Sequence, residues 1–92
     1  MPMTIADRAL ESITVELAIK TDHPLRVRRA GFLDQARRAI EQGSLTSEQI
    51  ARVAERQSIL RGNTAKAVHR CSPMLRAIHY AEAALTIVVV EN

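Results

Sequence analysis

The chain has 92 residues, one cysteine, one tyrosine, one phenylalanine and a formal net charge of +3. Its length suits one domain rather than a catalytic domain joined to a regulatory one, so we expect residues 1–92 to form a single helical domain. One cysteine excludes an internal disulfide, and a packed core or a second subunit must therefore stabilise the fold.

The sequence predicts neither a membrane span nor a secretory signal. The longest apolar stretch, near residues 83–90, is far shorter than the roughly 20 residues that cross a bilayer. The first residues also lack a basic segment followed by an apolar core. We therefore expect a cytoplasmic protein without a membrane partner.

The first predicted helix begins at Thr4, a preferred N-cap residue, and Asp7 favours the positive end of that helix. Apolar residues then recur with the helical period until His23 and Pro24 end the pattern. The residues of this apolar stripe are Ile5, Ala6, Ala9, Leu10, Ile13 and Leu17.

The second predicted helix runs from Pro24, which suits a first helical turn, to about Gln42, and Gly43 stops it. Its apolar face contains Leu25, Phe32, Leu33, Ala36, Ala39 and Ile40. Arg29 lies in the middle of this face, which leaves three interpretations. Arg29 extends to the helix edge, or it is buried beside an acid of another helix, or the packed part begins only after Gly31.

The third predicted helix begins at a capping box, with Thr46 as N-cap and Gln49 at the third helical position. Its apolar residues are Ile50, Val53, Ala54 and Leu60. Gly62 and Asn63 end it, since both tolerate the left-handed conformation common at helix ends. Thr64 is then expected to cap a short segment over residues 65–71.

The last predicted helix begins after Ser72 and Pro73 and continues to about Thr86. Its packed face is expected to contain Met74, Ile78, Ala81, Leu85 and Val88. Residues 86–90 are all β-branched and prefer strand geometry. They are either helical and buried, or extended and paired with a second copy of the chain. The predicted fold class is thus all-α, a bundle of four to five helices that ends in helix or in a short extended tail.

Apolar residues outside these faces favour a homodimer. A domain of this size buries little more than about 60% of the surface that its unfolded chain exposes, so a second copy could cover the surplus. The candidate dimer interface consists of Val15, Ile19, Leu85, Val88 and Val89. The alternative is that these are scattered surface residues, which need no partner.

Positive charge is concentrated in two blocks and comes mainly from arginine, which binds carboxylates or phosphates in a bidentate manner. The candidate partner-binding residues are Arg26, Arg28, Arg29 and Arg37 in the first block, and Arg56, Arg61, Lys66 and Arg70 in the second. The alternative is a solvated surface with helical ion pairs such as Asp34–Arg38 and Glu48–Arg52.

Reactive groups give no case for an enzyme, a metal or a cofactor. Cys71 has no second cysteine for a zinc site, and His69 and Cys71 are two apart, which places them on different sides of a helix. No phosphate-binding or dinucleotide-binding motif is present.

We therefore expect a non-enzymatic regulator, inhibitor or adaptor, whose Arg-rich face binds an acidic protein surface. The alternative is a DNA-binding transcriptional regulator that uses residues 47–71 as a helix–turn–helix. Its second helix would carry Lys66, His69 and Arg70, whereas Gln57 and Arg61 fit the motif poorly.

Overall fold

The computed structural model describes residues 2–91, and within them the chain forms five helices and no strand. The helices are α1 (Ile5–Leu17), α2 (Pro24–Glu41), α3 (Ser47–Leu60), α4 (Ala67–Arg70) and α5 (Pro73–Glu91). The predicted all-α bundle is confirmed. Of the two predicted forms of the tail, the helical one is present, because α5 continues through the β-branched residues to Glu91. The tail is buried only in part, since Val88 is buried but Val89 and Val90 are exposed.

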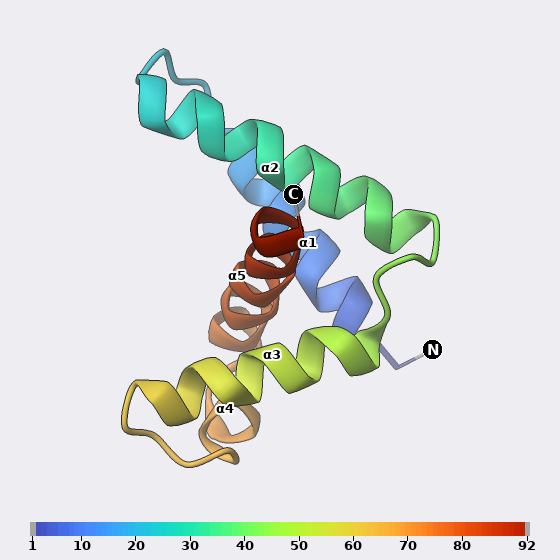
Figure 1. The fold of residues 1–92 in the computed structure, drawn as a ribbon, viewed down its shortest axis with the longest axis vertical. Coiled ribbons are helices and arrows are strands. Elements are labelled where there is room, and N and C mark those ends of the chain that lie inside the picture. Colours follow the sequence, from blue (N-terminus) through green and yellow to red (C-terminus); the bar gives the residue numbers. More distant parts are fainter. Residues whose placement is uncertain (1, 92) are drawn as a thin grey trace.

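Helix α5 is the centre of the fold and contacts each of the other four helices (Figure 1). In this view, α2 crosses one end of α5 and α3 crosses below it, while α1 lies behind. Helices α2 and α3 both contact α1 and α5, but they do not contact each other. The first half of α2 and the last half of α3 therefore form two separate lobes.

The predicted start signals of α1 and α3 are confirmed as capping boxes. The Asp7 backbone N–H donates to Thr4 Oγ1 at 3.0 Å, and the Thr4 N–H donates to an Asp7 carboxylate oxygen at 3.0 Å. The Thr4 N–H, followed by the Thr4 hydroxyl, stabilises the Asp7 carboxylate and lowers the pKa of Asp7 below its ordinary value. In α3, the Gln49 N–H donates to Thr46 Oγ1 at 3.3 Å and the Thr46 N–H donates to Gln49 Oε1 at 2.8 Å.

The predicted stop signals of α2 and α3 are also confirmed, whereas α1 ends at Leu17, before the predicted stop at His23 and Pro24. Gly43 follows α2 with a φ of 77°, and Gly62 follows α3 with a φ of 84°. This left-handed backbone costs glycine little because it has no Cβ.

The core lies around an alanine-rich side of α5. That side contributes Ala77, Ala81, Ala84 and Val88, with Tyr80 and Ala83 beside it. The other helices and turns pack against it through Ala9, Ile13, Leu33, Ala36, Ile40, Leu45, Ile50, Ala54 and Val68. Alanine lets helices approach closely but removes little apolar area from water per residue. The core is therefore dense and small.

The predicted packed faces of α3 and α5 are partly wrong. Met74 and Ile78 are exposed, and Ala77 and Tyr80 are buried in their place. Because helix α5 is apolar on several sides, the periodicity of its apolar residues does not show that the alanine side is the packed one. In α3, Leu60 is exposed, whereas Ser58 is buried and donates from its hydroxyl to the Thr64 carbonyl at 3.3 Å.

The predicted cap at Thr64 is wrong, and so is the start of the helix after it. Helix α4 begins at Ala67, with Lys66 at the N-cap position and no side-chain cap. The Thr64 carbonyl accepts from the Ala67 N–H at 3.0 Å, which forms a turn before the helix. Only one helical turn is left.

The candidate dimer residues do not form one uncovered face. Val88 is 8% exposed, and Leu85 packs against the core of the same chain. Val88 is thus covered without a second copy, and Leu85 is covered in part. Val15, Ile19 and Val89 are exposed. Dimerisation itself stays a prediction.

The segment Pro73–Val90 of α5 is long and apolar enough to cross a membrane, judged by length and composition alone. Central helices of water-soluble proteins often share these properties. The core that α5 forms with the other helices explains its buried apolar residues, whereas Met74, Ile78 and Val90 of the same segment are exposed. The expectation that the chain has no membrane partner stays a prediction.

The last turns of α5 generate the first test. Val88→Ala removes buried methyl groups and is expected to lower the free energy of unfolding by about 1–3 kcal/mol. Val90→Ala, at an exposed site, should change it by less than about 0.5 kcal/mol. Urea unfolding at two protein concentrations measures both variants. Val90→Ala could instead lower the free energy of unfolding as much as Val88→Ala does, by an amount that varies with protein concentration. That result would show that the tail lies in an intermolecular interface.

Candidate functional site

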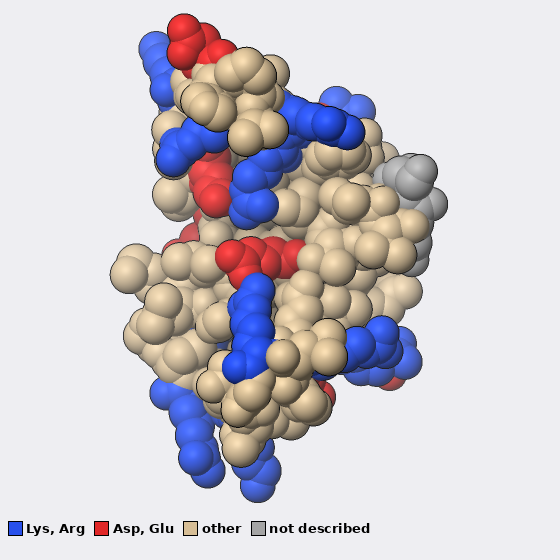
Figure 2. Space-filling model, turned by 60° about the vertical axis from the view of Figure 1, so that its left-hand side comes forward, with Lys and Arg blue, Asp and Glu red and all other residues tan. Residues whose placement is uncertain are grey.

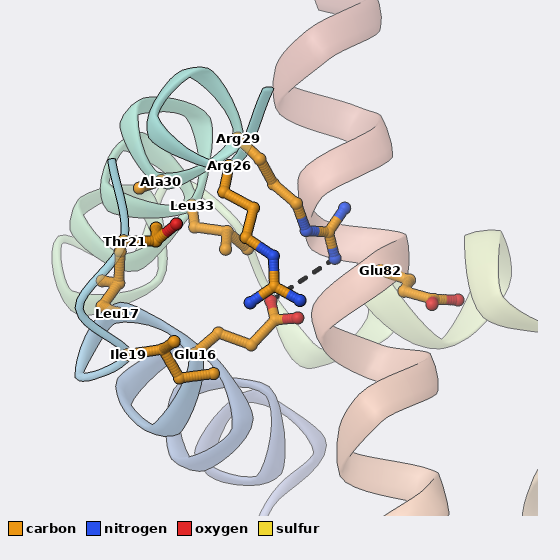
Figure 3. A pocket seen from close by; sticks show the side chains of 9 residues that line it. All are labelled: Glu16, Leu17, Ile19, Thr21, Arg26, Arg29, Ala30, Leu33 and Glu82. Atoms are coloured by element: carbon orange, nitrogen blue, oxygen red, sulfur yellow. Dashed lines mark hydrogen bonds and ion pairs between the residues drawn. The ribbon is translucent and has the colours of Figure 1, made fainter. Parts of the chain in front are cut away.

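A cavity of about 400 Å³ lies where the end of α1, the first half of α2 and the middle of α5 meet. Its lining residues are Glu16, Leu17, Ile19, Thr21, Arg26, Arg29, Ala30, Leu33 and Glu82. Figure 3 shows Arg26 and Arg29 extending from α2 towards Glu16 of α1. The cavity thus combines two cationic, two anionic and several aliphatic side chains.

Figure 2 shows the molecule hollowed between its two lobes, with acidic side chains in the hollow and basic side chains on both sides of it. We call this hollow, which includes the cavity, the cleft. It is open because α2 and α3 lie apart on α5.

The register of α2 places its arginines in the cleft. Pro24 occupies the first turn, and His23 provides no side-chain cap hydrogen bond. Residues 24–28 are all exposed, because this part of α2 projects beyond the core. Arg26 and Arg29 are three residues apart and therefore share a helix side, which they also share with Ala30 and Leu33. All four line the cavity.

Each basic block contributes one arginine to an ion pair in the cleft. Arg29 lies 3.4 Å from Glu16, with side chains that are 41% and 39% exposed. Arg61, at the C-cap position of α3, lies 3.5 Å from Glu82 of α5, and both side chains are also partly exposed. Pairs this exposed contribute at most about 1 kcal/mol, because water screens both charges. They orient the side chains without fixing them.

The position of Arg29 agrees in part with two of the three interpretations of the sequence. The acid of another helix is present, namely Glu16, but the pair is not buried. The packed part of α2 does begin near Gly31, since its first fully buried residue is Leu33. Leu25 is correspondingly exposed, contrary to its predicted place on the packed face.

Arg26 forms no ion pair or hydrogen bond within residues 2–90, and neither does Arg28. Arg37 and Arg38 both bind Asp34, and the Arg38–Asp34 distance is 2.7 Å. This confirms the predicted Asp34–Arg38 pair. The first block therefore has two uncompensated arginines, both on the projecting part of α2.

The second block is distributed over α3, α4 and the loop between them. Arg56, Lys66 and Arg70 are exposed and have no ion pair in the part of the chain that the structure describes. The predicted Glu48–Arg52 pair is likewise not formed there. Instead, Arg52 and Arg56 border a shallow second hollow of about 170 Å³ together with Ile87 of α5. The eight candidate partner-binding residues thus lie on two lobes, and not on one face.

Sequence reasoning did not select Glu16 or Glu82 as site residues. Glu16 belongs to α1 and Glu82 to α5, so only the tertiary fold brings them to one cavity. One signal was available for Glu82, which is the single carboxylate in the sequence from residue 73 to residue 90. An isolated charge in an apolar helix often marks a partner on another element.

The reactive residues on the other side of α5 form a separate group. Cys71 Sγ donates to the Val68 carbonyl at 2.9 Å, and His69 lies 3.4 Å from Glu55. Among the described residues, no three His, Cys, Asp or Glu side chains are placed to hold a metal ion. The absence of enzymatic activity and of a cofactor stays a prediction.

Tyr80 is the most buried titratable residue of this group, with 3% exposure. Burial raises its pKa above the ordinary value, since the phenolate would lose its hydration. Arg76 and Arg8 act in the opposite direction, because their positive charges favour the phenolate.

Comparison of the chain with protein-family models, with curated proteins and with solved structures finds no match.

The raised pKa of Tyr80 generates a pH prediction. Above its ordinary pKa of 10.0, the unfolded chain releases the tyrosine proton while the folded chain retains it. The stabilising effect is therefore complete below that pH and is lost as the pH rises through the folded-state pKa. Tyr80 is the only tyrosine, so the ultraviolet absorbance of tyrosinate reports on it alone.

We expect the absorbance midpoint of the folded chain to lie above 10.0. Denaturant unfolding should show a steeper alkaline loss of stability in the wild type than in Tyr80→Phe, which retains the other titrating groups. A midpoint at or below the ordinary value would contradict the burial argument.

Proposed function

We propose that this chain is a non-enzymatic regulator or adaptor, whose cleft binds an acidic and partly aliphatic segment of another protein. The observation that carries the proposal is Arg26, a cation without an acid partner among the described residues that lines a cavity. Aliphatic wall residues such as Ile19 and Leu33 adjoin it. An arginine beside apolar surface is a common anchor in protein interfaces.

The exposed residues around the cleft support a protein partner. Leu25 and Val27 are exposed on the same projecting turns as Arg26 and Arg28. A segment that lies along the cavity side of α2 would bring a carboxylate to Arg26 and would contact the flanking Leu25 or Val27. Arg28 lies two residues from Arg26 and therefore on a different side of the helix. Mixed apolar and cationic surface of this kind fits an amphipathic acidic segment.

Charge favours another protein over a second copy in this cleft. The projecting part of α2 carries Arg26, Arg28 and Arg29 but no acid. Two copies that met through it would bring like charges together, which disfavours association. Homodimerisation through Val15 and Val89 is a separate proposal.

Charge and helix length also favour protein over nucleic acid. Glu16 and Glu82 line the cavity and would repel a phosphate backbone. In the alternative function, α4 would be the recognition helix, but it has four residues. A single turn rises only about 6 Å, which limits the number of bases that its side chains reach. Exposed Lys66 and Arg70 keep this alternative testable.

The test is selection of peptides of random sequence on the immobilised full chain, followed by affinity measurement on purified variants. Enriched peptides should combine Asp or Glu with aliphatic residues. Arg26→Glu should weaken their binding by about tenfold or more, because it reverses the charge that the carboxylate meets. Arg52→Glu is the matched control, since it makes the same charge change on α3 and should leave the affinity within about twofold.

Enriched peptides without acidic residues, or equal affinities for Arg26→Glu and the wild type, would contradict the proposal. Binding of duplex DNA that falls steeply with salt and is lost in Arg70→Glu, but not in Arg26→Glu, would instead support the helix–turn–helix alternative.

A further inference from the structure

We propose that the cleft is a site for an aliphatic carboxylate, and that Glu16 is the internal competitor that occupies part of this site in the free chain. The inference rests on the proposed function and specifies its chemistry. A partner's carboxylate would bind Arg26 and then share or replace Glu16 at Arg29.

Two arginines of α2 extend towards one carboxylate, that of Glu16, because Glu82, the other acid of the lining, is paired with Arg61. Arg26 and Arg29 extend from adjacent turns of α2 towards the Glu16 carboxylate (Figure 3). Only Arg29 is paired with it, at 3.4 Å. Two guanidinium groups that extend into one cavity repel each other unless anions compensate both. Glu16 compensates one of them, which leaves a place for a further carboxylate.

The other charges in the cavity select the class of anion. Its lining has Arg26 and Arg29 as cations and Glu16 and Glu82 as anions, so that these four charges sum to zero. A dianionic phosphate would meet both carboxylates at close range, where repulsion is strongest. A monoanionic carboxylate, in contrast, is the same chemical group as the Glu16 side chain that already lines the cavity. Bidentate geometry between guanidinium and carboxylate further favours it.

The aliphatic wall selects what is attached to the carboxylate. Two aliphatic residues of the cavity lining, Leu17 and Ile19, keep exposed surface. An alkyl group next to the carboxylate would cover them, and each buried methylene favours binding by a factor of roughly four. The side chains of Asp or Glu next to a Leu, Ile or Val, or a chain terminus with such a residue, present this combination.

The exchange at Arg29 is feasible because the internal pair is weak. Both side chains are about two-fifths exposed and the N–O distance is 3.4 Å. An ion pair of this type changes an equilibrium constant by up to about fivefold. Removal of the Glu16 charge should therefore tighten carboxylate binding by about two- to fivefold. The loss of a native ion pair would thus increase the affinity for the ligand.

The experiment is titration of the full chain with hexanoate, an aliphatic monocarboxylate, followed by NMR of the arginine Nε–Hε groups. Wild type is expected to bind with a dissociation constant in the millimolar range, about what a ligand of this size allows. Glu16→Gln should bind two- to fivefold more tightly, and Arg26→Gln should bind more weakly than the wild type. Inorganic phosphate should bind more weakly than hexanoate.

The matched control is Glu11→Gln, which removes the same charge from α1 at an exposed site outside the cavity. It should leave the hexanoate affinity within the error of the wild type. Equal affinities for Glu16→Gln and Glu11→Gln would overturn the inference, as would absence of a response at Arg26 and Arg29. Preference for phosphate over hexanoate would overturn the assigned ligand class.

These outcomes are separable from failure of the proposed function. If selected acidic peptides bind through Arg26 but Glu16→Gln has no effect, Glu16 is not a competitor and the function stands. If Glu16→Gln tightens hexanoate binding but no acidic peptide is enriched, the carboxylate site stands and the protein partner fails.

Discussion

The alanine-rich side of α5 is the packing constraint on which the rest of this structure depends. Ala77, Ala81 and Ala84 are buried on it, and α1 packs against them through Ala9 and Ile13. Small side chains allow this close approach. With one slender helix at the centre, α2 and α3 reach α5 and α1 but not each other. The cleft follows directly from this arrangement, because no helix of the described residues fills the space between the two lobes.

The same constraint explains the electrostatics of the cleft. The first turns of α2 extend past the core, so their arginines have solvent or a cavity beside them rather than another helix. Arg29 reaches Glu16 of α1 and Arg61 reaches Glu82 of α5, and these two pairs connect the lobes to the central helices. Both pairs are partly exposed and therefore weak. Arg26 forms no ion pair with either carboxylate, and this leaves the cleft able to accept an anion from outside.

Local signals predicted the fold better than periodicity did. Thr4, Thr46, Gly43 and Gly62 set helix ends through their own backbone chemistry, which needs no tertiary information, and all four are confirmed. The packed side of α5 was not predictable in the same way. An all-round apolar helix offers several candidate faces, and alanine has too little hydrophobic contrast to select one. The strand preference of the terminal valines was overridden by packing of Val88.

The candidate site was predictable only in part. The sequence marked Arg26 and Arg29 as candidate partner-binding residues and Arg29 as an anomaly that needed an acid. It did not select Glu16 or Glu82, since these approach the arginines only when α1, α2 and α5 assemble. The first sequence block also combines arginines whose surroundings in the fold differ. Arg37 and Arg38 share Asp34, whereas Arg26 and Arg28 have no acid partner within residues 2–90.

Native-state hydrogen exchange of the backbone amides tests the central claim most directly, because it compares the packed centre with the projecting turns in one experiment. We expect the slowest exchange in α5 near Ala81 and Ala84 and in α1 near Ile13, where opening approaches global unfolding. The amides of residues 26–29 should exchange much faster, although they are helical. Protection of these turns equal to that of α5 would contradict the account, since it would show that the cleft is already covered in the free protein.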